Sequence, residues 1–179
     1  MDRRQRKTRE AIFSAFTELL SEKSLSQITV GEIIERADVG RATFYAHFET
    51  KDFLLRELCA ELFCHVFDAS GEGECEHRHI FHCDRQGEVF LHLFEHLKKN
   101  DNHILDLLAS EGNDLFLRYF KDELYALIEN RNDTPIGLPK DFWVNHVASS
   151  FVEAVRWWHR GGMALSPEEI NEYFTRTIN

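Results

Sequence analysis

Residues 41–48 carry side chains suited to contacting a polyanion on one face of a short predicted helix. Phe44 and Phe48 lie four positions apart, so they point inward together if the segment is helical. The side chains that then point outward are small, hydroxyl-bearing or basic. A helix entering a DNA major groove about 12 Å wide needs this character, because small residues allow close approach and polar groups reach bases and phosphates. The segment therefore predicts a recognition helix.

A second short helix and a turn precede this segment and would position it. Thr29 and Glu32 have the spacing of a capping box, which predicts a helix start after Thr29. Asp38-Val39-Gly40 is the predicted turn, in which Gly40 supplies backbone freedom and also caps the following helix. Two short helices joined by a three-residue turn are typical of a helix-turn-helix.

The rest of the chain also shows helical periodicity, and a fourth helix is expected after Thr50. Further helices are predicted at 4–22, 86–99, 102–109, 113–131, 140–160 and 167–178. The expected fold class is all-α with about nine helices. Residues 1–50 are predicted to form a three-helix DNA-binding domain, and residues 51–179 a helical bundle for ligand binding and dimerisation.

Charge is distributed unevenly along the sequence. The net charge of the whole chain is −10, yet residues 1–58 hold ten Lys/Arg and ten Asp/Glu and are neutral. The first nine residues contain Asp2 and the basic residues Arg3, Arg4, Arg6, Lys7 and Arg9. A basic arm on a neutral segment, followed by an acidic body, favours a DNA-binding domain attached to a domain with another role.

Residues 8–58 resemble the DNA-binding domain of the TetR family. The matching features are Ile28-Thr29-Val30, Ile33-Ile34-x-x-Ala37-x-Val39, Ala42-Thr43-Phe44-Tyr45-x-His47-Phe48 and Lys51-x-x-Leu54-Leu55. The resemblance implies a homodimeric repressor that binds a double-stranded DNA operator and leaves it when a small molecule of unknown identity binds the C-terminal domain. It also implies DNA contacts by Thr29, Arg41, Ala42, Thr43, Tyr45, His47 and Lys51.

The predicted helix 140–160 has two apolar stripes, which need two surfaces to bury against. We expect one stripe to form a four-helix dimer interface together with the following helix, at Val144, Val147, Phe151, Val155 and Trp158. The other stripe contains Trp143, Ala154 and Trp157. The alternative is the central helix of a monomeric bundle. A dimer would place two recognition helices about 34–36 Å apart, or a multiple of that, and so match a palindromic operator.

Histidines and cysteines between residues 64 and 96 raise the alternative of a metal-sensing regulator, since imidazole and thiolate bind zinc and nickel. The candidates are Cys64, His65, Cys75, His77, His79, His82, Cys83, His92 and His96. Their spacing matches no compact four-ligand pattern, so we expect no metal and no cofactor. A metal-dependent helical enzyme and a helix-turn-helix used for protein contacts are further candidate functions. We expect no catalytic residues, because the sequence lacks HExxH or a similar spacing.

The sequence also bears on cellular location. The N-terminus is charged and lacks the apolar stretch of a secretory signal, and the apolar segments are shorter than a membrane span. We therefore expect a cytoplasmic protein with no membrane partner.

Overall fold

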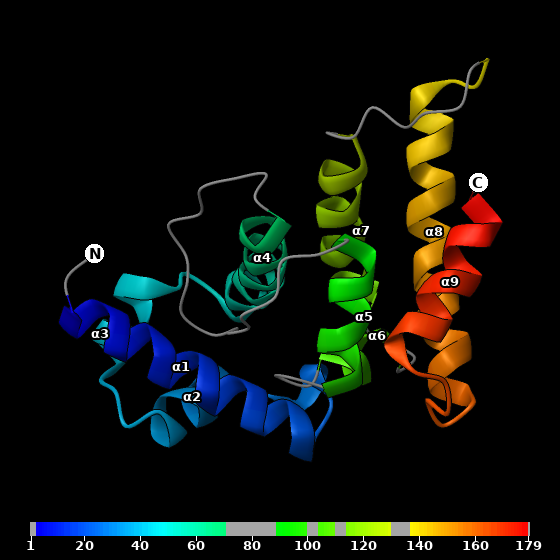
Figure 1. The fold of residues 1–179 in the computed structure, drawn as a ribbon. Coiled ribbons are helices and arrows are strands. Elements are labelled where there is room, and N and C mark those ends of the chain that lie inside the picture. The colour runs from blue at the N-terminus through cyan, green and yellow to red at the C-terminus, as the bar shows by residue number, and fades with distance from the viewer. Residues whose placement is uncertain (1–2, 71–88, 100–103, 110–113, 130–136, 179) are drawn as a thin grey trace. The chain divides into compact units, whose positions relative to one another are not determined.

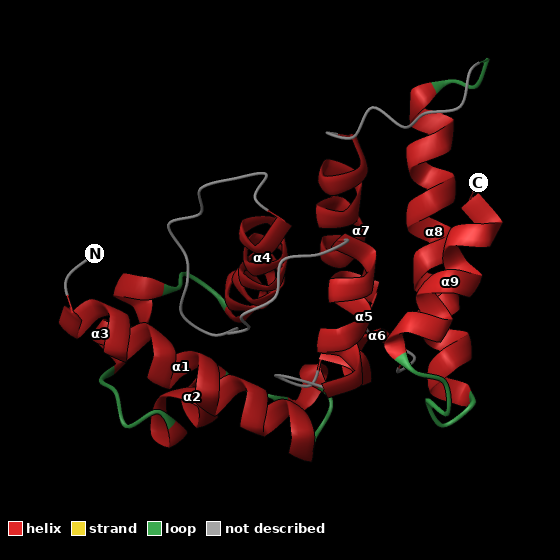
Figure 2. Cartoon of the chain, in the orientation of Figure 1, coloured by secondary structure: helices red, strands yellow, loops and turns green. Residues whose placement is uncertain are grey.

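A computed structural model describes residues 3–70, 89–99, 104–109, 114–129 and 137–178 of the chain (Figure 1). The described residues form α-helices and one short 3-10 helix, and no strand occurs among them (Figure 2). The predicted all-α fold class is confirmed. No helix in these ranges has the length and apolar character needed to cross a membrane.

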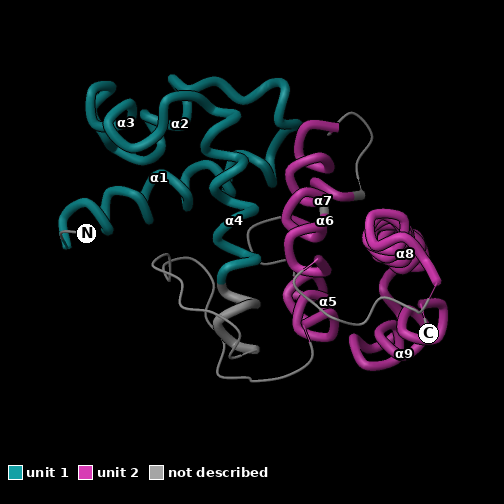
Figure 3. Tube along the Cα trace, turned by 90° about the horizontal axis from the view of Figure 1, so that it is seen from above, with its two compact units in different colours: residues 1–86, 101–103 teal, residues 87–100, 104–179 magenta. Residues whose placement is uncertain are grey.

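The chain divides into two compact units (Figure 3). Unit 1 comprises residues 1–86 and 101–103, and unit 2 comprises residues 87–100 and 104–179. The elements of unit 1 are α1 (Arg3–Glu22), η1 (Leu25–Gln27), α2 (Val30–Arg36), α3 (Arg41–His47) and α4 (Lys51–Ser70). Those of unit 2 are α5 (Val89–Lys99), α6 (Ile104–Ala109), α7 (Asp114–Glu129), α8 (Lys140–Arg160) and α9 (Pro167–Ile178). The predicted bounds of α8 and α9 are confirmed.

Unit 1 has an aromatic core that connects α1 to the helix-turn-helix. The face of α1 with Phe13 and Phe16 is buried, as its helical periodicity predicts. Phe13 meets Phe48 edge-on, with ring centroids 5.2 Å apart. Phe44 lies beside Phe48, at 6.0 Å between centroids. Burying each such ring contributes about 1.5–3 kcal/mol, so these contacts fix the orientation of α3 on α1.

Unit 2 is built around α8, which packs against α6, α7 and α9. Its core is a cluster of fully buried rings in which Phe151 of α8 lies 4.7 Å from Phe94 of α5 and 5.5 Å from Phe174 of α9, measured between centroids. Trp158 is buried beside them and satisfies its indole N–H by donating to the Leu165 carbonyl at 3.1 Å. The cluster therefore holds α5, α8 and α9 together.

The connection between α8 and α9 uses the stop and start signals that the sequence contains. Gly162 has φ +68, and two backbone bonds, from Gly162 N to the His159 carbonyl and from Met163 N to the Trp158 carbonyl, close α8 as a Schellman motif. At the start of α9, Ser166 and Glu169 form a capping box, because each backbone N–H donates to the other's side chain.

Candidate nucleic-acid interface

The first helix of the helix-turn-helix is α2, and a reciprocal capping box fixes its start. Glu32 N donates to Thr29 Oγ1 at 3.3 Å, and Thr29 N donates to Glu32 Oε2 at 2.9 Å. The predicted capping box is confirmed. Glu32 also forms an ion pair with Lys23, and this bond, followed by those from Thr29, lowers the pKa of Glu32 to about 2.

In the turn between α2 and α3, the residue with a positive φ is Asp38. Asp38 has φ +50, in the left-handed region that a short polar side chain tolerates. Gly40 has φ −71 and ψ 149, and its carbonyl accepts from Phe44 N at 3.0 Å as the N-cap of α3. The prediction that Gly40 caps α3 is confirmed. The prediction that it supplies the backbone freedom of the turn is wrong, because the positive φ belongs to Asp38.

Helix α3 directs its polar side chains outward, because Phe44 and Phe48 are completely buried beneath it. Among the residues predicted to contact DNA, those of α3 that are exposed are Arg41, Ala42, Thr43 and Tyr45. Tyr45 is 46% exposed, and its ring stands edge-on to Phe44 with centroids 5.4 Å apart. Packing therefore supports one side of the Tyr45 ring and leaves the other accessible to a ligand.

Lys51 has its ammonium group held against the backbone of the segment before α2. Its Nζ donates to the carbonyls of Leu25 and Ile28, both at 2.8 Å. An ammonium has three donors, so one N–H remains for an anion. The two carbonyls fix where that donor lies.

His47 and Thr29 are partly committed to contacts within the chain. His47 is half-buried, and burial followed by the positive charge of Arg9 lowers the pKa of His47. Burial and Arg9 therefore both favour the neutral imidazole, which can take part in hydrogen bonds. Thr29 is exposed, but its hydroxyl donates to Glu32 at 2.8 Å, so a phosphate bond from Thr29 has to replace that contact.

Sequence reasoning missed Arg9, which is the buried support of this interface. Its guanidinium lies 5.0 Å from the ring centroids of both Phe13 and Phe48. It also forms ion pairs with Glu57 at 2.6 Å and with Glu61 at 3.3 Å on α4. Arg9 of α1 thus contacts both Phe48, the C-cap residue of α3, and α4. Its place in a run of basic residues gave no signal that it alone is buried.

In unit 2, the structure differs from the dimer interface expected on α8. The five predicted residues all lie in the interior of the unit, where they pack within the same chain: Val144, Val147, Phe151, Val155 and Trp158. Their burial within one chain does not favour an interface on this stripe, and the position of the dimer interface stays a prediction. The opposite side of α8 carries Phe142 and Trp157, which are 57% and 55% exposed. Of the second predicted stripe, Trp157 is exposed, whereas Trp143 and Ala154 are half-buried.

The histidine and cysteine candidates fall largely outside the described residues. This holds for Cys75, His77, His79, His82 and Cys83, and for the side chain of His65. His92 and His96 are described, are buried in α5, and have Nε2 atoms 3.1 Å apart. Within the described ranges, no group of three or more potential metal ligands comes together.

Comparisons with known proteins cover both units. The sequence profile described as "Bacterial regulatory proteins, tetR family" matches residues 12–58, and the profile "Transcriptional regulator C-terminal region" matches residues 84–179. The chain is 39% identical over 79 residues to YxbF, an HTH-type transcriptional regulator of Bacillus subtilis. That match covers 41% of this chain and 21% of YxbF. The chain therefore spans about a fifth of the length of that curated relative.

Two solved structures resemble the whole chain. A TetR transcriptional regulator from Streptococcus agalactiae is 34% identical, with a TM-score of 0.73 over 99% of this chain and 97% of that one. FadR of Bacillus subtilis, solved in complex with stearoyl-CoA, is 16% identical, with a TM-score of 0.62 over 94% of this chain and 96% of that one. The second likeness concerns the fold alone. Both TetR profiles match this chain, and the S. agalactiae regulator resembles it over nearly its full length. This chain therefore belongs to the TetR family of transcriptional regulators.

Proposed function

We propose that this regulator is a homodimeric repressor that binds a palindromic operator and is released by a small-molecule effector. The observation that carries the proposal is the outward face of α3, where exposed polar side chains stand on two completely buried rings. The DNA contacts are assigned to Thr29, Arg41, Ala42, Thr43, Tyr45, His47 and Lys51. Residues 1–50 bind DNA in this proposal, and residues 51–179 regulate and dimerise.

The contacts divide into two chemical kinds. Arg41 begins α3 and can donate a bidentate pair to a guanine or a phosphate, and Ala42 beside it allows close approach to a base. Tyr45 and Lys51 suit phosphate oxygens, which position the protein without selecting a sequence. Two copies of α3 are needed because one short helix contacts few base pairs.

Dimerisation is assigned to the outward side of α8 together with α9. Phe142 and Trp157 on α8 and Tyr173 on α9 each expose about half of a large ring. A two-fold axis would pair these helices with their copies in a four-helix interface and bury the rings. This face replaces the inward stripe as the interface because its side chains are free of the core of the unit.

An effector site is proposed in unit 2. A hollow of about 600 Å³ is lined by Tyr125, Glu129, Lys140, Asp141, Val144 and Asn145. Its size falls in the range of about 300–1,000 Å³ that holds small molecules in proteins. FadR, which has a similar fold, was solved with stearoyl-CoA, so a helical unit of this kind can hold an organic ligand. An effector must bind the DNA-free conformation more tightly than the DNA-bound one.

The proposal is tested by measuring the affinity of the full chain for a palindromic duplex from its own upstream region, using fluorescence anisotropy. Arg41→Ala and Tyr45→Ala should each weaken binding by about tenfold or more, since a good base or phosphate contact contributes about 1–3 kcal/mol. The matched control is Arg36→Ala, because Arg36 is also an exposed Arg of the helix-turn-helix but is held by Glu22 at 2.5 and 2.9 Å. Equal effects of Arg36→Ala and Arg41→Ala would contradict the assignment of α3.

Effector release has its own test. An effector that binds the DNA-free conformation more tightly than the DNA-bound one raises the thermal stability of the free regulator and, by linkage, weakens its binding to the operator. Compounds found by thermal shift are added to the operator complex, and the repressor proposal expects dissociation. A ligand that stabilises the protein and leaves operator affinity unchanged is not the effector. If every ligand that stabilises the protein leaves its operator affinity unchanged, release by an effector is contradicted.

A further inference from the structure

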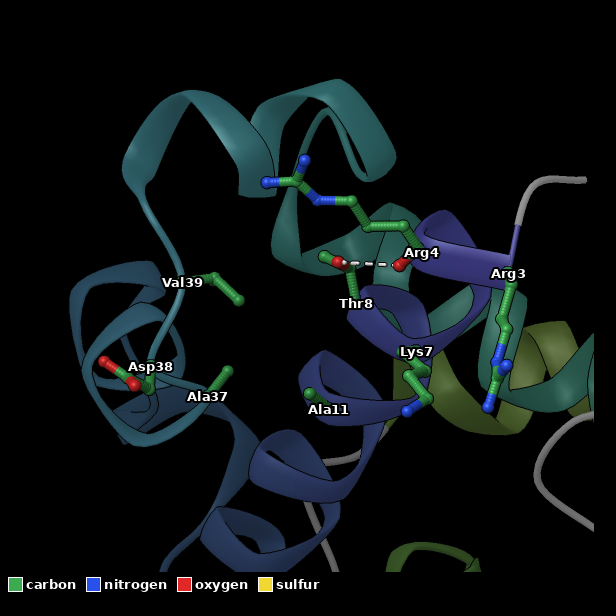
Figure 4. Close-up of a pocket in the computed structure, with 8 residues that line it drawn as sticks. All are labelled: Arg3, Arg4, Lys7, Thr8, Ala11, Ala37, Asp38 and Val39. Carbon is green, nitrogen blue, oxygen red and sulfur yellow. Dashed lines mark hydrogen bonds between the residues drawn. The ribbon is translucent and has the colours of Figure 1, made fainter.

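Helix α1 and the turn of the helix-turn-helix enclose a groove that lies apart from the seven assigned DNA contacts. The groove has a volume of about 530 Å³ and lies within unit 1 (Figure 4). Short apolar side chains of Ala11, Ala37 and Val39 line its floor, and basic side chains of α1 line its rim. Figure 4 shows Ala37 and Val39 pointing from the turn towards α1, and Arg4 extending across the hollow.

The rim consists of the basic residues of α1 that lack a carboxylate partner. Arg6 pairs with Glu10 at 3.7 Å, and Arg9 pairs with two glutamates of α4. In the part of the chain that the structure describes, Arg3, Arg4 and Lys7 form no ion pair, and all of them are exposed. These are also the cations that line the groove. Asp38 belongs to the opposite wall, but its carboxylate points away from them (Figure 4).

In the absence of an anion, the mutual repulsion of Arg3, Arg4 and Lys7 destabilises α1. Lys7 lies four residues after Arg3 and three after Arg4, so all three project from neighbouring positions of α1. Like charges at these spacings repel each other. An anion bound in the groove would convert that repulsion into attraction.

We propose that this groove binds the sugar–phosphate backbone of the operator, beside the base pairs that α3 contacts. The inference rests on the proposed function. A DNA backbone alternates anionic phosphates with apolar deoxyribose rings, which complement a cationic rim and a floor of short apolar side chains. The groove is also next to the recognition helix in the chain, because Val39 of its floor is separated from Arg41 only by the N-cap residue Gly40. Arg3, Arg4 and Lys7 thus extend the DNA contact from α3 onto α1.

The test compares the salt dependence of operator binding between two neutralised variants. The first is Arg3→Gln/Arg4→Gln/Lys7→Gln, and the matched control is Arg6→Gln, which removes positive charge from the same helix outside the groove. The logarithm of the operator-binding constant is plotted against the logarithm of the salt concentration. The magnitude of its slope should fall by about 0.9 for each phosphate that the triple variant no longer neutralises. This variant should also bind about tenfold or more weakly at fixed salt, with its preference for operator over scrambled DNA unchanged. Arg6→Gln should leave the slope close to that of the wild type.

Hydroxyl-radical footprinting gives a second measurement that does not depend on total charge. The triple variant should lose protection of the backbone that flanks the site and keep protection at its centre. A slope equal to that of Arg6→Gln, or an unchanged footprint, overturns this proposal. If the wild type shows no preference for operator over scrambled DNA, the proposed function fails instead, so the two failures are distinguishable.

Discussion

The outward faces of α3 and α8 differ although the two helices are built in the same way. Each stands on buried aromatic side chains: Phe44 of α3 with its C-cap residue Phe48, and Phe151 and Trp158 of α8. The exposed side of α3 carries hydroxyl and basic groups, whereas that of α8 carries Phe142 and Trp157. The buried rings of the two helices therefore do not indicate which partner each helix binds. The exposed side chains indicate it, because hydroxyl and basic groups suit phosphates, whereas half-exposed rings suit another apolar surface.

The two units also differ in what lies inside them. The core of unit 1 contains Arg9 and its carboxylate partner Glu61, both almost fully buried. Among the described residues of unit 2, the buried polar side chains are His92, His96 and Asn171, and none of them is an Arg, Lys, Asp or Glu. Unit 1 therefore has a buried charge contact beneath the face proposed to bind DNA. Substitutions in the two units should accordingly have different consequences.

The largest effect is expected from Arg9→Met in unit 1. Removing one partner of a buried ion pair typically costs about 3–5 kcal/mol, because the remaining charge is left in a poorly solvating interior. Arg6→Met is the matched control, since its ion pair with Glu10 is exposed and should contribute about 1 kcal/mol or less. Urea unfolding measures both values. Equal losses in the two variants would show that burial of Arg9 adds nothing to stability.

A smaller effect, confined to assembly, is expected from Trp157→Ala in unit 2. A large ring at the centre of an interface typically contributes about 2 kcal/mol, so the dimer dissociation constant should rise by roughly 30-fold or more. Sedimentation equilibrium measures it. Tyr45→Ala removes a ring of similar exposure from unit 1 and should leave dimerisation unchanged while weakening DNA binding. A dimer that is unaffected by Trp157→Ala would place the interface elsewhere.

The capping box of α2 predicts a dependence of stability on pH. The pKa of Glu32 is lowered from 4.5 to about 2 in the folded chain, chiefly by its bond with Lys23 and then by those with Thr29. The folded state therefore gains stability from Glu32 above pH 4.5 and loses it as the pH falls from 4.5 through 2. In Glu32→Gln the loss of stability over this range should be shallower than in the wild type, as measured by thermal unfolding at successive pH values. Parallel curves for the two proteins would contradict the lowered pKa.

The smallest effect is a gain of stability from Gly40→Ser. A Cβ at Gly40 would lie 3.6 Å from Thr43 Oγ1, which is an ordinary contact, and the backbone already has the N-cap conformation. A serine hydroxyl there can accept from the first turn of α3, and the gain should be a few tenths of a kcal/mol from the cap, with a similar contribution from the less flexible unfolded chain. Gly40→Ala isolates the second contribution. If Gly40→Ser is no more stable than Gly40→Ala, the added cap is absent.

The helices could be predicted from the sequence because their signals are local. The capping pairs Thr29/Glu32 and Ser166/Glu169 mark helix starts, and Gly162 marks an end, without reference to the rest of the fold. The outward face of α3 was predictable for a similar reason. The spacing of Phe44 and Phe48 defines its buried side.

The features that were missed depend on contacts between distant residues. Arg9 meets Glu57 and Glu61 across about fifty positions of sequence, so its burial has no local signature. The two stripes of α8 are similarly apolar, and the packing of α5, α7 and α9 on the Phe151 side decides which one is buried. The positive φ at Asp38 was missed because the adjacent glycine is the usual residue for that conformation.

The central claim, that α3 reads DNA as part of a symmetric dimer, is tested most directly by in-vitro selection of the full chain against random duplex DNA. A symmetric dimer should enrich a palindromic sequence whose half-sites lie about 10–10.5 base pairs apart, or a multiple of that. Selection with Tyr45→Ala under the same conditions should give little enrichment, although that variant still dimerises. If the wild-type dimer enriches no sequence, or enriches one without two-fold symmetry, the central claim is contradicted.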